Sequence, residues 1–154
     1  MIRFFGCVLL LLLFGCNVPE PAAEDESEPL YFETIGRGQT GAGRDTIETV
    51  VASVEDWDRL RAAVQPLAPF ESVDFTQTMV ALIALPSESG GYTIEVETVE
   101  LLDGVVRINY LVSEPGMDCI TPTALALPFQ AILFRRADGD VKFVRRTEKY
   151  LCGM

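Results

Sequence analysis

No histidine occurs among the 154 residues of the chain. Histidine is the commonest general base near neutral pH and a frequent zinc ligand, so its absence excludes Ser-His-Asp triads and His-ligated zinc sites. A nucleophilic serine would have only Lys142 and Lys149 as candidate lysine bases. We therefore assign no catalytic residue, and we expect no enzyme, no bound metal and no cofactor.

Basic residues are also scarce. The chain has 12 lysines and arginines against 23 acidic residues, which gives a formal net charge of −11. Proteins that bind nucleic acid normally present a basic surface to the phosphates. The charge balance argues strongly against a nucleic-acid partner.

A long apolar run is missing as well. Residues 4–14 are almost uninterruptedly apolar after Arg3, but a membrane-spanning helix needs about 20 such residues. A basic residue followed by a short apolar run is typical of a secretory signal peptide, here residues 1–15. Leu13-Phe14-Gly15-Cys16 resembles a bacterial lipobox, which implies diacylation of Cys16 and cleavage before it. An ordinary cleaved signal peptide is the alternative.

Residues 16–30 have the composition of a tether. They include Glu20, Glu24, Asp25, Glu26 and Glu28 together with three prolines and no base, as expected of a solvated, extended linker. We expect lipidated Cys16 to hold the protein in the membrane of a bacterial cell envelope, on the extracytoplasmic side. Asn17 stands where an aspartate would resemble an inner-membrane retention signal. We therefore expect the outer membrane in a cell that has one.

Two cysteines remain after Cys7 leaves with the signal peptide and Cys16 takes lipid. Cys119 and Cys152 would lie in an oxidising compartment, where a disulfide between them is expected. A redox pair or half of a metal site are the alternatives. Their spacing matches neither a CxxC motif nor a four-ligand site.

Alternation of apolar and polar residues predicts a single β-rich domain at residues 31–154. Strands are expected at 31–35, 45–52, 79–85, 92–101, 106–112, 129–136 and 141–147. Ser53 precedes Val54, Trp57 and Leu60 at helical spacing, which predicts one short amphipathic helix. The fold class is α+β and β-dominated, an antiparallel sheet or sandwich.

Local signals predict how these strands connect. Asp103-Gly104 predicts a hairpin turn, and a second turn around Asp138-Gly139 predicts a C-terminal β-hairpin. A shift in the apolar phase predicts a bulge near Thr98. Residues 36–41 match GxGxxG, but a strand pattern follows instead of the helix that a dinucleotide site requires. We interpret those glycines as a mobile hairpin loop.

The segment before the strand at 92–101 is the candidate binding loop. Ser89, Gly90, Gly91 and Tyr92 combine two flexible glycines with an aromatic side chain, so a partner backbone could approach closely there. The alternative is a tight strand connection whose tyrosine packs inward.

Four motifs carry a family resemblance. They are Glu55-Asp56-Trp57, the eight residues Val73-Asp74-Phe75-Thr76-Gln77-Thr78-Met79-Val80, the five residues Gly90-Gly91-Tyr92-Thr93-Ile94, and Pro128-Phe129. Together they resemble the PrcB family, named after a lipoprotein subunit of a bacterial surface protease complex. The resemblance covers roughly residues 32–144, although this chain has Glu88-Ser89 where the family usually has Pro-Thr. It implies an extracytoplasmic lipoprotein that binds or stabilises protein partners, and it supplies no catalytic residues.

We therefore predict a membrane-anchored, protein-binding accessory module, with assembly or maturation of a surface protease complex as its candidate role. A loop-based protease inhibitor is the alternative, suggested only by analogy with chagasin-like inhibitors. A third hypothesis is an enzyme that uses carboxylates, for which Asp118 or Glu114 would have to lie beside a cleft.

Overall fold

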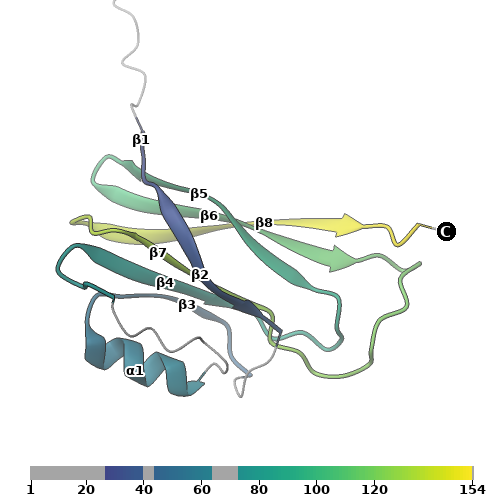
Figure 1. Cartoon of the computed structure of the whole chain (residues 1–154). Coiled ribbons are helices and arrows are strands. Elements are labelled where there is room, and N and C mark those ends of the chain that lie inside the picture. Colours follow the sequence, from purple (N-terminus) through teal and green to yellow (C-terminus); the bar gives the residue numbers. More distant parts are fainter. Residues whose placement is uncertain (1–26, 40–43, 64–72, 154) are drawn as a thin grey trace, which may run out of the picture.

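The computed structural model describes residues 27–39, 44–63 and 73–153. Within these ranges the chain forms two facing sheets with one helix outside them (Figure 1). In chain order the elements are β1 (Glu28–Pro29), β2 (Phe32–Gly38), β3 (Ile47–Val51), α1 (Val54–Ala63), β4 (Thr78–Ala84), β5 (Thr93–Leu102), β6 (Val105–Pro115), β7 (Phe129–Arg135) and β8 (Asp140–Tyr150). The signal peptide, Cys16 and most of the predicted tether lie outside the described residues.

The two sheets have four strands each. Sheet A has the order β1-β5-β6-β8 and sheet B the order β2-β7-β4-β3. All hydrogen-bonded neighbours are antiparallel except β6 and β8, which are parallel. The predicted β-dominated, sandwich-like α+β fold is confirmed.

Strand β4 is buried on both faces, as its uninterrupted apolar sequence predicts. Ala81 and Ile83 face the core between the two sheets, whereas Val80, Leu82 and Ala84 face a second core on the outer side of sheet B. Sheet B is therefore the middle layer of the molecule, and sheet A covers only one of its faces.

Helix α1 covers the outer face of sheet B. Ser53 caps the helix, because its Oγ accepts a hydrogen bond from the Asp56 backbone N–H at 3.2 Å. Trp57 is 3% exposed and packs in the outer core, which also contains Phe129 of β7. The lone tryptophan thus stabilises the attachment of the helix to the sheet.

Gln130 on β7 lies in the core between the sheets and is 1% exposed. Its Oε1 accepts a hydrogen bond from the Val96 backbone N–H of β5 at 2.7 Å, and its Nε2 donates to Thr34 Oγ1 of β2 at 2.9 Å. Each partner adjoins a break in strand register, between Val96 and Thr98 in β5 and between Thr34 and Gly36 in β2. One side chain therefore joins both sheets at their bulges.

The hairpin of β5 and β6 forms as the sequence predicts. Asp103 has φ 51° and Gly104 has φ 75°, the positive values that a type I′ turn requires at both central residues. The bulge expected near Thr98 is also present. This hairpin supplies the two central strands of sheet A.

The C-terminal strands reverse direction at the turn around Asp138-Gly139, as the predicted hairpin requires. The two arms, however, belong to different sheets: β7 pairs with β2 and β4, and β8 pairs with β6. The chain crosses from one layer of the sandwich to the other at this turn. This crossing could not be predicted from the sequence, because both arms need an apolar inner face whether they pair with each other or belong to different sheets.

Two predictions about the N-terminal part of the domain were wrong. Glu28-Pro29 pair with β5, and Leu30 is buried between the sheets, so the sandwich begins before residue 31. The hairpin expected around the GxGxxG motif is absent, since β2 and β3 lie at opposite edges of sheet B. Gly36 and Gly38 belong to β2 itself, and residues 40–43 lie outside the described residues.

Replacement of Gln130 tests its role in joining the sheets. We expect Gln130→Met to lower the free energy of unfolding by about 1–3 kcal/mol, because the buried Val96 N–H loses its acceptor. Thr34→Val, which removes only the acceptor for Nε2, should cost less. Urea denaturation of both variants measures this, with Gln77→Met, on an exposed side chain, as the control. Equal stability of Gln130→Met and wild type would contradict the assignment.

Candidate functional site

The predicted binding loop packs against its own chain. It lies between β4 and β5, where it contacts the connection from β6 to β7, residues 116–128. The Gly90 N–H donates to the Pro122 carbonyl at 3.0 Å. Ser87 and Ala126 exchange two backbone hydrogen bonds of 2.9 and 3.0 Å. We call this end of the sandwich, with the C-terminal residues 151–153, the loop end.

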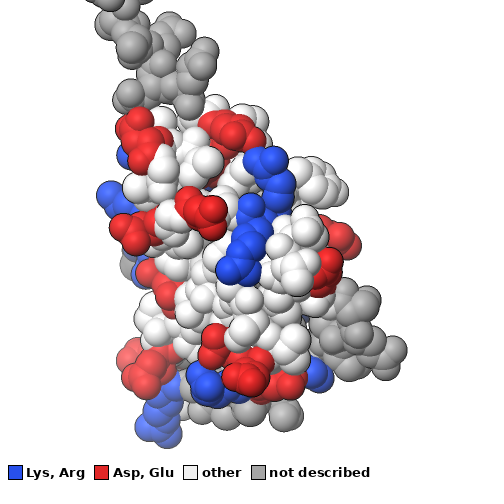
Figure 2. All heavy atoms as spheres, turned by 90° about the vertical axis from the view of Figure 1, so that its left-hand side faces the viewer, with Lys and Arg blue, Asp and Glu red and all other residues white. Residues whose placement is uncertain are grey.

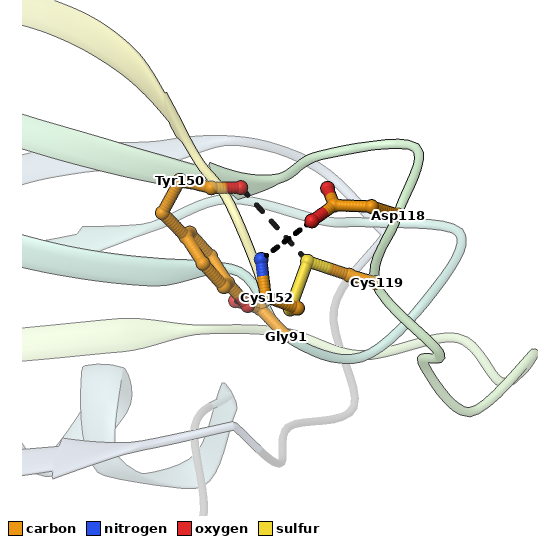
Figure 3. The surroundings of a disulfide bond; sticks show 5 residues. All are labelled: Gly91, Asp118, Cys119, Tyr150 and Cys152. Carbon is orange, nitrogen blue, oxygen red and sulfur yellow. Dashed lines mark hydrogen bonds between the residues drawn. A yellow bond between two sulfur atoms is a disulfide. The ribbon is translucent and has the colours of Figure 1, made fainter. Parts of the chain in front are cut away.

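Gly91 is required by this internal packing. Its φ is +92°, and a Cβ built on it would lie 2.9 Å from Thr121 Cγ2 and 3.0 Å from the Tyr150 hydroxyl. That hydroxyl donates to the Gly91 carbonyl at 2.9 Å (Figure 3). The second glycine thus allows two neighbouring segments to approach the backbone, and both belong to this chain.

Tyr92 and Ser89 also have internal contacts. The Tyr92 side chain is partly buried against the core between the sheets, and its carbonyl accepts a hydrogen bond from Gln39 Nε2 at 3.3 Å. The Ser89 carbonyl accepts from Ser87 Oγ at 2.9 Å. These contacts favour the interpretation as a tight strand connection. A binding role for the loop stays a prediction.

The exposed apolar surface of the loop end lies next to this loop. Met117 and Ile120 are fully exposed, and Leu125 and Leu151 are 73% and 80% exposed. We call these four residues the apolar tip. Sequence reasoning missed them, since they follow neither strand nor helix periodicity. The signal that could have identified them is the presence of several large apolar residues in the connection 116–128, whose sequence has no strand or helix pattern.

A disulfide braces the apolar tip. Cys119 and Cys152 are joined, as the sequence predicts, with their Cα atoms 5.0 Å apart. Asp118 Oδ2 accepts a hydrogen bond from the Cys152 backbone N–H at 2.9 Å (Figure 3). The Gly116 N–H donates to the Tyr150 carbonyl at 2.9 Å. The end of β8 is therefore fixed to the connection that carries Met117 and Ile120.

The apolar tip and the start of the domain lie at opposite ends of the sandwich (Figure 1). β1 pairs with Glu100 and Leu101 at the far end of β5, whereas β5 begins at Thr93 beside the candidate binding loop. Ten residues of strand, roughly 30 Å, separate them. The N-terminal end also carries charged side chains of both signs, as Figure 2 shows from that side.

A polar cavity of about 320 Å³ opens between the sheets near the loop end. Glu88, Glu114, Arg145 and Tyr92 are among its lining residues, and Arg145 lies 4.0 Å from Glu114. Asp118, the other carboxylate considered for an enzyme, is hydrogen-bonded to the Cys152 backbone instead. Among the described residues, no three His, Cys, Asp or Glu side chains are grouped to hold a metal ion.

A larger and more apolar cavity lies at the N-terminal end, where the chain passes from sheet A to sheet B. Its volume is about 550 Å³, and Leu30, Tyr31, Leu133 and Arg135 help to line it. Arg135 of β7 forms an ion pair with Glu28 of β1 at 2.6 Å. This contact fixes the first residues of the domain across the two sheets.

Tyr110 is fully buried in the core between the two sheets. Its hydroxyl donates to Glu48 Oε1, a contact from β6 to β3. Burial, and then the hydrogen bond to Glu48, raise the pKa of Tyr110 above its ordinary value. Tyr110 therefore stays protonated near neutral pH, where it links the sheets as a hydrogen-bond donor.

The longest of the four motifs that carry the resemblance, residues 73–80, begins with a turn. Asp74 Oδ1 accepts hydrogen bonds from the Thr76 hydroxyl at 2.6 Å and the Thr76 N–H at 2.9 Å. The Asp74 carbonyl accepts from the backbone N–H groups of Gln77 and Thr78. These residues direct the chain into β4, so the structure accounts for the motif by turn geometry.

No protein-family model, curated protein or solved structure matches the chain. The resemblance to the PrcB family stays a prediction. No helix within the described ranges is long and apolar enough to cross a membrane.

Replacement of Gly91 tests the internal packing of the candidate binding loop. We expect Gly91→Ala to lower the free energy of unfolding by about 2 kcal/mol or more, from both the positive φ and the contacts with Thr121 and Tyr150. Gly104→Ala is the matched control, because its φ is +75° and nothing lies within 4 Å of the added Cβ. Thermal and urea unfolding give both values. A cost no larger than that of Gly104→Ala would contradict the packing role.

The Asp74 turn makes a prediction about pH. The hydrogen bonds from the Thr76 hydroxyl and then the Thr76 N–H lower the pKa of Asp74. The stability that this lowered pKa contributes is fully present at pH values above the ordinary aspartate pKa of about 3.9. It is lost as the pH falls through the lowered pKa of the folded protein. NMR titration should find the Asp74 midpoint below that value in wild type and closer to it in Thr76→Val. The same midpoint in both proteins would show that the Thr76 hydroxyl does not lower the pKa of Asp74.

Proposed function

We propose that the chain is a lipid-anchored, extracytoplasmic protein that binds a protein partner through the apolar tip. The observation that carries the proposal is that Met117, Ile120, Leu125 and Leu151 are each largely exposed at the loop end, where a disulfide joins the chain segments beside three of them. Large exposed apolar groups on a folded domain are typical of interaction sites.

The anchor is proposed from the sequence. A short apolar run ends at the lipobox-like Leu13-Phe14-Gly15-Cys16, and an acidic, proline-containing segment follows. Lipid on Cys16 would attach the domain by its N-terminal end. The apolar tip would then point away from the membrane, where a partner protein could reach it.

The energetics favour a protein as the occupant of the apolar tip. Removing apolar surface from water contributes about 25 cal/mol per Å². Met117, Ile120 and Leu151 lie beside the disulfide, so little conformational freedom of the backbone would be lost when they are buried in an interface. Exposed apolar side chains on a backbone held by a disulfide suit the centre of a protein interface.

The family resemblance supports a protease as the partner. It implies a lipoprotein that acts as a subunit of a bacterial surface protease complex, and this chain offers no histidine base of its own. We propose an accessory role in assembly or maturation of such a complex.

A protease inhibitor is the second candidate function. The observation in its favour is the 116–128 connection, held by the disulfide at Cys119 with Ile120 fully exposed. A loop held in this way can occupy a substrate cleft without losing much conformational entropy.

Site-specific photo-crosslinking in intact cells tests the proposed contact. A photoreactive residue at position 120 should yield an adduct with one specific extracytoplasmic protein, and the same residue at Asp103, an exposed turn at the opposite end, should not. Changing Leu125 and Leu151 to aspartate should reduce the adduct at least tenfold, because a charge in an apolar interface is costly. Unchanged thermal unfolding of this variant is the control for folding.

The outcome separates the two functions. If the captured protein is a protease, its activity should fall when this lipoprotein is absent under the accessory hypothesis and rise under the inhibitor hypothesis. Equal crosslinking from positions 120 and 103, unaffected by the aspartate changes, would refute binding through the apolar tip.

A further inference from the structure

Among the strands that the structure describes, β8 forms one long unpaired edge of sheet A. It spans 11 residues and pairs along its whole length with β6, and sheet A ends there. From Lys142 to Lys149, only Phe143 is partly buried, and the other side chains are exposed. An open edge offers unpaired backbone N–H and C=O groups to an extended segment of another chain.

The charge of β8 is opposite to that of the protein. Lys142, Arg145, Arg146 and Lys149 are four of the chain's 12 basic residues, in a chain of net charge −11. Arg146 pairs with Glu148 and with Glu97 of β5, and Arg145 lies 4.0 Å from Glu114. Within the described part of the chain, Lys142 and Lys149 form no ion pair.

We infer that the open edge of β8 binds an extended acidic segment of a partner protein by strand addition. Backbone hydrogen bonds would attach the segment, and its carboxylates would pair with the basic side chains, Lys142 and Lys149 first. Basic side chains discourage edge pairing with apolar or basic strands, so they select an acidic one.

Other occupants fit the edge less well. Two copies of β8 paired antiparallel about Arg145 would place Arg145 of one copy opposite Arg145 of the other, and like charges opposite one another are destabilising. The same register would place Lys142 opposite Glu148, so the sedimentation experiment below tests this occupant. The first described strand of the same chain, β1, pairs with β5 at the opposite edge of sheet A from β8. The β8 edge is distinct from the apolar tip, so this inference does not depend on the proposed function.

Peptide binding to the full-length protein in detergent tests the inference. The probe is a peptide of about a dozen residues that repeats Glu-Glu-Val-Val, so that both faces of the extended strand carry glutamate opposite Lys142 and Lys149, compared with one that repeats Lys-Lys-Val-Val. Fluorescence anisotropy should show binding of the glutamate peptide alone, weakened by added salt. Hydrogen exchange should slow at backbone amides of β8 and be unchanged in β2 and β3, the edges of sheet B.

Charge-reversal variants provide the matched comparison. Lys142→Glu with Lys149→Glu should weaken binding of the glutamate peptide at least about tenfold. Arg37→Glu with Arg44→Glu changes the net charge equally at exposed positions away from β8, and should change the affinity less than twofold. Equal weakening in both variants, or binding without slower exchange in β8, would overturn the inference.

Sedimentation identifies a competing occupant. We expect that copies of the full-length protein do not associate with one another by pairing their β8 strands. If copies associate, and Lys142→Glu with Lys149→Glu abolishes the association, the acidic segment comes from a second copy and the assignment to a partner protein is wrong. Loss of crosslinking at the apolar tip would leave this inference intact, because the two experiments probe different surfaces.

Discussion

The buried amide of Gln130 is the contact on which the relation of the two sheets depends. It accepts from the Val96 N–H in sheet A and donates to Thr34 in sheet B, beside a break in strand register in each sheet. An apolar core alone permits neighbouring sheets to shift, since hydrophobic contacts are not directional. A hydrogen-bonded amide with partners in both layers fixes one alignment. Tyr110 and Glu48 connect the sheets at a second place, between β6 and β3.

The two ends of the sandwich, which the aligned strands hold apart, differ in the side chains that they expose. The N-terminal end has an ion pair, Arg135 with Glu28, and charged side chains of both signs (Figure 2). The loop end has the apolar tip, and the disulfide holds it in place. Because β5 and β6 run the length of the sandwich, attachment at one end would present the other end to a partner. The architecture thus suits a tethered binding protein, whichever partner it has.

The most conspicuous sequence motifs have structural roles. Gly91 accommodates Thr121 and Tyr150, and Asp74 closes the turn before β4. Glycines and short polar residues are demanded by backbone conformation as often as by ligands, so a motif of these residues identifies the fold before it identifies a site. The surfaces proposed for partners, the apolar tip and the β8 edge, have no motif of their own. They are defined by what the described part of the chain leaves uncovered.

Most of the strands, the helix and the turn between β5 and β6 could be predicted from the sequence, whereas β1 could not. The uninterrupted apolar run of β4, the Ser53 cap, the Asp103-Gly104 turn and the bulge near Thr98 depend on local residue chemistry and on periodicity, which can be read without the fold. The pair Cys119 and Cys152 followed from elimination. Only the tertiary structure decided that β8 pairs parallel with β6, that β2 and β3 lie at opposite edges, and that Met117 and Ile120 are exposed. Strand partners and exposure depend on contacts between residues far apart in the chain, and an alternating pattern fixes which face is buried but not the neighbour beside it.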